Sequence, residues 1–185
     1  MALQLVTPLD SERLVLRGVQ HSDLADLLRM NGDDAVTRFL PYETWVSRAD
    51  GEAWIARMSA MTAAGGGLQL VIVEKTSHSV VGTCLLFRYD QASARAEIGY
   101  ALAREWWGRG IMREALSALI GHAFGACELH RVEAEVDPDN RPSNAVLASL
   151  GFTCEGRLRQ RWVAKGRRYD THVYGLLREE WAGRP

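Results

Sequence analysis

The segment Arg104–Ala115 constrains this chain most, because it joins a strand pattern to a helix pattern through a glycine-rich turn. It reads Arg-Glu-Trp-Trp-Gly-Arg-Gly-Ile-Met-Arg-Glu-Ala and follows the apolar run Ala96–Leu102. Gly108 and Gly110 can adopt positive φ and let the backbone approach a ligand closely. The first turn of a helix has N–H groups without intrahelical partners and a dipole that favours an anion. The segment therefore predicts a cradle for a phosphate or pyrophosphate group.

Two familiar phosphate-binding motifs do not match this turn. The dinucleotide fingerprint needs a small residue three places after the second glycine, where this chain has Arg113. The nucleotide-triphosphate loop needs Gly-x-x-x-x-Gly-Lys-Ser/Thr, which does not occur in the sequence. A glycine-rich turn that only links a strand to a helix stays open as the alternative for this segment.

A second strand, turn and helix follow the first. Val132–Val136 alternates apolar and acidic residues, as a half-buried strand does. The next residues, Asp137–Asn144, read Asp-Pro-Asp-Asn-Arg-Pro-Ser-Asn. Pro142 is typical of a helix start and Gly151 of a helix C-terminal cap. Two strand–turn–helix units, each with a distinctive turn, therefore occur in succession.

Taken together, these motifs resemble the GNAT superfamily of acyl-CoA-dependent N-acetyltransferases. The opening Ser11–Arg17 is similar to the first strand of the branch that acetylates the N-termini of ribosomal proteins. The resemblance extends over residues 9–181. The stretches that carry it are Glu97–Tyr100, Trp107–Gly110 with Glu114 and Ala115, Asn140–Asn144, and Leu150–Phe152 with Glu155 and Gly156.

The resemblance implies one α/β (α+β) domain over residues 1–185, with its core at about residues 9–181. We expect a mixed, mostly antiparallel sheet with helices on both faces. The strands Ala96–Leu102 and Val132–Val136 should run parallel and then splay apart, which leaves a cleft for the pantetheine arm of CoA. Periodicity alone predicts only an α/β protein. The other expected elements are strands at Arg13–Arg17, Leu68–Val73 and Val80–Phe87, helices at Ser47–Ala63 and from Met112 to Phe124, and a hairpin of Thr153–Val163 and Arg168–Leu177.

Composition excludes several classes of protein. The 22 basic and 23 acidic residues give a net charge of −1, which argues against nucleic-acid binding through bulk positive charge. No run of residues reaches the length of a membrane span, and the N-terminus lacks the features of a signal peptide. The three cysteines have no metal-ligand spacing. We therefore expect a cytoplasmic protein with reduced thiols and no metal site.

The implied reaction needs a base for the amine and a proton for the leaving thiolate. Glu97 is the candidate base, because it is the only acidic residue of its predicted strand. A structural ion pair with Arg88 or Arg95 is the alternative for Glu97. Many family members have a tyrosine acid four residues before the glycine of the Gly-Phe pair, where this chain has Leu147. The resembled branch points instead to Ser143, for which helix capping is the alternative.

Acetyl-CoA is the co-substrate that the resemblance implies. The backbone around Trp107–Arg113 is expected to hold its pyrophosphate, and the end of the central strand its pantetheine arm. For Asn140 and Asn144, turn and cap roles are the alternative to contacts with the cofactor. The predicted cofactor-binding residues are Tyr100, Ala101, Leu102, Trp107, Gly108, Arg109, Gly110, Ile111, Met112, Arg113, Asn140 and Asn144.

The acceptor is expected to be a primary amine, either on a protein N-terminus or on a small molecule such as a polyamine or an aminoglycoside. The walls of its site are predicted at Tyr42, Glu43, Trp45 and Asp170, with core packing as the alternative for the tryptophan. A module that binds acyl-CoA without catalysis is a third hypothesis. The identity of the acceptor stays open, as does the oligomeric state, a homodimer included.

Overall fold

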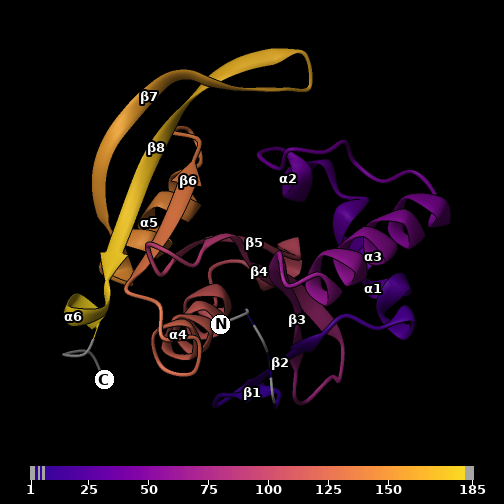
Figure 1. The fold of residues 1–185 in the computed structure, drawn as a ribbon. Helices are drawn as coiled ribbons and strands as arrows, with labels where there is room; N and C mark the ends of the chain where they lie inside the picture. Colours follow the sequence, from indigo (N-terminus) through magenta and orange to yellow (C-terminus); the bar gives the residue numbers. More distant parts are fainter. Residues whose placement is uncertain (1–2, 4, 6, 182–185) are drawn as a thin grey trace.

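The computed structural model describes residues 3, 5 and 7–181 of the chain. At its centre is an eight-stranded sheet (Figure 1). Its strand order is β1-β2-β3-β4-β5-β6-β8-β7, and every neighbouring pair is antiparallel except β5 with β6. This confirms the predicted mixed, mostly antiparallel sheet. The strands are β1 (Leu9–Asp10), β2 (Leu14–Gly18), β3 (Gly67–Glu74), β4 (Val80–Asp90), β5 (Arg95–Leu102), β6 (Arg131–Val136), β7 (Thr153–Ala164) and β8 (Arg167–Leu177).

Helices cover both faces of the sheet, as expected. One core cluster packs α1 and α3 against β3 and the end of β5, and a second packs α4 and α5 against the opposite face. The helices are α1 (Leu24–Asn31), α2 (Asp34–Thr37), α3 (Arg48–Ala63), α4 (Ile111–Phe124), α5 (Arg141–Ser149) and α6 (Arg178–Trp181), with 3-10 turns at His21–Asp23 and Arg104–Trp106. Among the described helices, none has the length and apolar character needed to cross a membrane.

The helix α4 fills the centre of the larger core because its apolar residues recur every three or four positions. Leu116, Leu119 and Ile120 are all completely buried. The helix begins after Gly110, whose φ of 73° is in the left-handed region, and ends at Gly125. Glycine adopts the left-handed conformation without the steric cost that a side chain would add.

The strands β5 and β6 share only a short parallel pairing, of residues 95–97 with residues 131–133. Beyond it, β5 continues to Leu102 and β6 to Val136 without pairing to each other. The carbonyl of Ala94 accepts a hydrogen bond from the N–H of His130. Because backbone groups alternate in direction along a strand, the even-numbered residues of β5 direct theirs towards β6. The predicted splay is confirmed, and backbone groups of Tyr100 and Leu102 line it.

The hairpin β7–β8 forms as predicted and arches across the molecule to α2 (Figure 1). Lys165 and Gly166 at its tip have φ of 52° and 69°, which suits a two-residue hairpin turn. The Lys165 Nζ donates a hydrogen bond of 2.8 Å to the carbonyl of Thr37. A register shift between Leu158 and Trp162 bends β7, with Gln160 at a φ of 50°. The hairpin thus closes one side of the sheet face that carries α1 and α3.

Residues 34–46 have no regular pattern in the sequence, and the structure has the four-residue helix α2 there, followed by a loop. The carboxylate of Asp33 caps α2 by accepting a hydrogen bond of 2.9 Å from the N–H of Ala35. One turn of helix is too short to show a periodicity. At the ends of the predicted domain, residues 1–2, 4, 6 and 182–185 lie outside the described residues.

Replacing Leu119 by alanine should lower the free energy of unfolding by about 2–5 kcal/mol, because it leaves a cavity between α4 and the sheet. Urea denaturation followed by circular dichroism measures the change. Ser117→Ala, in the half-buried part of the same helix, is the control and should change it by about 0.5 kcal/mol or less. Equal effects of the two substitutions would contradict the placement of Leu119 in the core.

Candidate active site

The turn before α4 has the backbone that a phosphate cradle requires. Gly108 and Gly110 have φ of 71° and 73°, and the residues from Trp107 to Gly110 are exposed. No side chain caps α4, and its first intrahelical bond runs from the N–H of Glu114 to the carbonyl of Gly110. The N–H groups of residues 111–113 therefore have no intrahelical acceptor and lie at the positive end of the helix dipole.

This turn is fixed by contacts with the loop between β1 and β2. The carboxylate of Glu114 accepts hydrogen bonds from Ser11 Oγ (2.8 Å) and from both the backbone N–H and Nε of Arg13 (2.7 Å each). Burial would raise the pKa of Glu114, but these donors together hold it below its usual value. Arg13 also donates to the carbonyl of Arg109 at 3.0 Å. The loop thus holds the glycine-rich turn at two points, the side chain of Glu114 and the carbonyl of Arg109.

The side chains of the cradle differ in what they can contribute. Ile111 and Met112 are buried in the core, so only their backbone groups can reach a phosphate. Arg113 is exposed, and the guanidinium of Arg109 lies 5.2 Å from the ring centroid of Trp106. Of the residues predicted for cofactor binding, the two arginines are therefore the available cationic side chains at this turn.

At the end of β5, the backbone groups of Ala101 and Leu102 point in different directions. The Ala101 carbonyl lies against Gly82 of β4, 2.7 Å from where a Cβ would stand on that glycine. The Leu102 carbonyl accepts a hydrogen bond of 2.8 Å from the indole nitrogen of Trp107. By strand alternation it is Leu102, together with Tyr100, that presents backbone groups to the splay. The backbone of Ala101 instead serves the pairing with β4.

The two asparagines at the start of α5 make the contacts of a cap and a turn. Asn140 is the N-cap and accepts a hydrogen bond of 3.3 Å from the N–H of Ser143. Asn144 Nδ2 donates to the carbonyls of Asp137 (3.1 Å) and Asn140 (2.7 Å). Its Oδ1 accepts from the hydroxyl of Tyr174 at 2.7 Å. The side chain of Asn144 therefore ties α5 to β8 and to the preceding loop.

Ser143 and Tyr100 form a pair of hydroxyl groups beside the splay. Their oxygens are 2.7 Å apart, and either can be the donor. Burial raises the pKa of Tyr100 to about 12, so its hydroxyl is protonated at neutral pH. Because Tyr100 contacts the core around α4, this pair lies on the same face of the sheet as the phosphate cradle.

Glu97 lies on the opposite face from that pair. Its neighbours Ala96 and Ile98 pack into the core around α4, so strand alternation turns Glu97 to the face of α1 and α3. The residue is only 8% exposed, and its Oε2 accepts a hydrogen bond of 2.7 Å from Arg88. The ion pair foreseen as the alternative is present with Arg88, whereas Arg95 pairs with Glu133.

The surroundings of Glu97 raise the pKa of its carboxyl group above the ordinary value. Burial raises the pKa of its carboxyl group and the charges of Glu135 and Glu133 add to that rise, while Arg88 opposes it. A carboxylate whose pKa is raised towards neutral pH is suited to accept a proton from an ammonium group. Glu97 therefore forms the ion pair with Arg88 and is also suited to act as the base.

Glu135 and Trp162, which the sequence analysis did not single out, lie around Glu97 together with Arg88, one of its two expected ion-pair partners. Arg88 reaches it from β4, while Glu135 of β6 binds both Arg88 (3.4 Å) and the indole nitrogen of Trp162 (2.6 Å). The Arg88 guanidinium lies 5.1 Å from the ring centroid of Trp162. The alternation of β6 could have indicated Glu135, but the bulges that direct Arg88 and Trp162 have no signal in the sequence.

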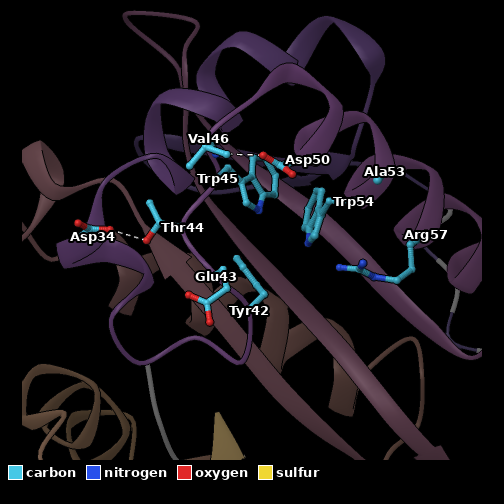
Figure 2. Close-up of a pocket in the computed structure, with 10 residues that line it drawn as sticks. All are labelled: Asp34, Tyr42, Glu43, Thr44, Trp45, Val46, Asp50, Ala53, Trp54 and Arg57. Carbon is cyan, nitrogen blue, oxygen red and sulfur yellow. Dashed lines mark hydrogen bonds between the residues drawn. The ribbon is translucent and has the colours of Figure 1, made fainter. Parts of the chain in front are cut away.

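A hollow of about 650 Å³ lies on the face of α1 and α3, between α3 and the loop before it (Figure 2). It includes the predicted acceptor residues Tyr42, Glu43 and Trp45. Trp45 and Trp54 are 7% and 6% exposed, with ring centroids 5.8 Å apart. Both therefore also pack in the core, which is the alternative given for Trp45 in the sequence analysis. The lining residues are Asp34, Tyr42, Glu43, Thr44, Trp45, Val46, Asp50, Ala53, Trp54 and Arg57.

The polar groups of the hollow differ in their exposure and in whether they are already hydrogen-bonded. The Tyr42 hydroxyl donates a hydrogen bond of 2.9 Å to Asn31 Oδ1, and burial raises its pKa. Glu43 is exposed, and Figure 2 shows the guanidinium of Arg57 directed towards the ring of Trp54. The hollow thus offers aromatic surface together with the guanidinium of Arg57 and three carboxylates, of which those of Asp34 and Asp50 already accept hydrogen bonds and that of Glu43 is exposed.

The structure does not bring Asp170 to this hollow or to Glu97. Alternation along β8 puts Asp170 on the face of His172, whose ring nitrogen lies 3.0 Å from Asn144. Its carboxylate binds Arg157 at 2.7 Å and accepts a hydrogen bond of 2.9 Å from the N–H of Gln160. Asp170 therefore supports the bulge of β7, and we leave it out of the acceptor site.

Comparisons with known proteins agree with this geometry. A family model described as an acetyltransferase (GNAT) domain matches residues 13–153. The uncharacterized N-acetyltransferase p20 of Bacillus licheniformis is 37% identical over 173 residues, which cover 94% of this chain and 97% of that protein. The ribosomal protein uS5-alanine N-acetyltransferase of Escherichia coli (strain K12) is 28% identical over 183 residues, which cover 94% of this chain and 92% of that enzyme.

Solved structures show the same likeness. RimJ of Mycobacterium smegmatis, in complex with CoA-disulfide, matches with a TM-score of 0.82 and 29% identity, over 90% of this chain and 83% of that chain. The family model covers well over half of the sequence. The splayed strands and the glycine-rich helix start agree with these matches, which show that the chain belongs to the GNAT family of N-acetyltransferases.

Proposed function

We propose that this enzyme transfers an acetyl group from acetyl-CoA directly to the free amine of a protein N-terminus. One observation carries the proposal: the gap between β5 and β6 has the phosphate cradle on one face of the sheet and the buried carboxylate of Glu97 on the other. Two substrates can therefore meet in the gap from opposite sides. Relatives named as acetyltransferases of ribosomal-protein alanine and serine support the choice of acceptor.

The residues of the cradle fit a CoA pyrophosphate. Its oxygens would accept hydrogen bonds from the N–H groups of residues 108–113, because the N–H of Trp107 already donates to the carbonyl of Arg104, and Arg109 and Arg113 would add positive charge. The backbone groups of Tyr100 and Leu102 in the gap would hold the pantetheine amides. When bound, acetyl-CoA supplies the thioester carbonyl that the amine attacks.

Proton transfer is assigned to groups on the two faces. Glu97 takes a proton from the acceptor's ammonium group, directly or through water, so that the neutral amine can attack. Ser143 donates a hydrogen bond and then a proton to the departing sulfur, in the role that a tyrosine at position 147 would have in many relatives. Tyr100 orients the Ser143 hydroxyl through the hydrogen bond between them, and burial keeps Tyr100 protonated at neutral pH by raising its pKa to about 12. Ser143 regains its proton from solvent water after the thiol has formed.

Direct transfer agrees with the environment of the cysteine beside this site. Cys84 pairs with Tyr100 across β4 and β5 and is completely buried. Burial raises the pKa of its thiol to about 12, so the nucleophilic thiolate does not form at neutral pH. An acetyl-cysteine intermediate at this position is therefore not part of the proposal. A ribosomal acceptor would place the enzyme in the cytoplasm.

A synthetic peptide with a free N-terminal alanine or serine should be acetylated by this enzyme and acetyl-CoA. Mass spectrometry of the peptide and thiol release both measure the reaction. The same peptide with an acetylated N-terminus is the control and should release no thiol. Turnover of spermidine without turnover of either free peptide would show that the acceptor is a small amine.

Substituting Gly110 by valine should weaken CoA binding by about tenfold or more, because a β-branched side chain opposes the φ of 73° and crowds the cradle. Isothermal calorimetry measures the affinity. Gly166→Val places the same strain at a φ of 69° in the hairpin turn and should leave CoA affinity unchanged. If both variants bind CoA as the wild type does, the cradle is elsewhere.

Changing Glu97 to glutamine should lower kcat by a factor of about 10²–10⁴ with an amine acceptor. In the wild type, kcat/KM should rise with pH through the raised pKa of Glu97, because the base acts when deprotonated. The variant should lose this acidic limb of the pH profile. Glu133→Gln, on the same sheet face, is the matched control and should keep it. An unchanged profile in Glu97→Gln would remove this residue from the role of base.

A further inference from the structure

Arg88 is held in an unusual backbone conformation next to the proposed base. It lies at a register shift of β4, between Phe87 and Asp90, with a φ of 52°. A residue with a side chain rarely adopts this left-handed conformation, and such strain is concentrated at functional positions. The bulge directs the guanidinium onto the sheet face that carries Glu97.

The Arg88 guanidinium occupies a site formed by two carboxylates and an indole ring. Its Nη1 lies 2.7 Å from Glu97 Oε2 and 3.4 Å from Glu135 Oε1. Its Cζ lies 5.1 Å from the ring centroid of Trp162. Opposite charges and an aromatic face are the groups that bind an organic cation. We call Glu97, Glu135 and Trp162 the cation box.

The hairpin β7–β8 supplies one wall of this box. Trp162 follows the bulge of β7, and its indole nitrogen donates a hydrogen bond of 2.6 Å to Glu135 Oε2. Arg161 lies 3.6 Å from the other oxygen of Glu135, and Lys165 holds the hairpin tip on α2. The carboxylate of Glu135 and the ring of Trp162 are therefore fixed relative to one another.

The guanidinium belongs to a side chain that is far more exposed than either carboxylate. The side chains of Glu97 and Glu135 are 10% and 14% exposed, whereas that of Arg88 is 42% exposed. Arg88 thus reaches into the box from its rim, and partly exposed ion pairs are weak enough to exchange. A base that takes a proton directly from an amine must contact that amine, yet Arg88 now holds an oxygen of Glu97.

A buried hydroxyl on the same face also lacks a partner. Thr171 of β8 is 1% exposed, and within the described part of the chain its Oγ1 has no hydrogen bond. Strand alternation puts Thr171 on the same face as Val173, which pairs with Glu135. A peptide acceptor carries amide groups that such an oxygen can bind.

We propose that the cation box is the subsite for the acceptor's terminal ammonium and that Arg88 fills it until an acceptor displaces it. The inference rests on the proposed function, in which Glu97 contacts the acceptor. The two carboxylates and the indole ring select a cationic amine over a neutral or acidic group. No covalent bond forms or breaks in the exchange, because one cation replaces another.

Calorimetric titration of the CoA-saturated protein with a peptide that has a free N-terminal alanine tests the exchange. Arg88→Gln should bind the peptide about tenfold more tightly than the wild type, the factor expected if Arg88 fills the box roughly nine-tenths of the time. Arg88→Lys, which keeps a cation, should bind as the wild type does. Arg95→Gln is the matched control, because Arg95 is 41% exposed and pairs with Glu133 outside the box, and it should change nothing.

Two further variants locate the subsite. Glu135→Gln and Trp162→Leu should each weaken binding of the free peptide, and an N-acetylated peptide should not respond to Arg88→Gln. Equal or weaker binding by Arg88→Gln, or no binding by any variant, would overturn the proposal.

Acetylation of the same peptide separates this inference from the proposed function. If the wild type acetylates the peptide and Arg88→Gln binds it no more tightly, the exchange is wrong and the function stands. If Arg88→Gln binds more tightly and no acetylation occurs, the box binds a cation and the proposed reaction is wrong.

Discussion

The short parallel pairing of β5 with β6 is the constraint on which the rest of the structure depends. Only residues 95–97 and 131–133 are in register, within a sheet that is otherwise antiparallel. A parallel pair requires a crossover connection, which here is the helix α4. Because the crossover begins at the end of β5, the N-terminus of α4 lies beside the place where the strands part. The gap and the phosphate cradle are therefore two results of one connection.

The same alternation of side chains along β5 separates the chemistry on the two faces. Tyr100 turns to the cradle side and meets Ser143, while Glu97 turns to the other side and meets Arg88. If both lay on one face of the sheet, the base and the hydroxyl pair would share the same solvent. With the gap between them, the amine and the departing sulfur can be served from opposite directions. The hairpin β7–β8 adds a wall on the Glu97 side through Trp162 and Lys165.

Local patterns predicted the parts of this arrangement that lie close together in the sequence. The positive φ of Gly108 and Gly110 and the buried face of α4 follow from neighbouring residues and are observed. The role of Asp170 did not follow, because strand alternation and the contact with Gln160 decide which face it occupies. The pair of Glu97 with Arg88 was one of the expected alternatives, but the contacts of Arg88 with Glu135 and Trp162 were missed for a related reason. Arg88 and Trp162 are directed by bulges, and they meet only after distant strands have paired.

A crystal structure with a bisubstrate analogue, in which the sulfur of CoA is joined through an acetyl link to an alanine-peptide amine, tests the central claim most directly. We expect the pyrophosphate on the N–H groups of residues 108–113, the link in the gap between β5 and β6, and the peptide nitrogen beside Glu97 on the opposite face. Both arms leaving the gap on one face, or a pyrophosphate bound away from the glycine-rich turn, would contradict it.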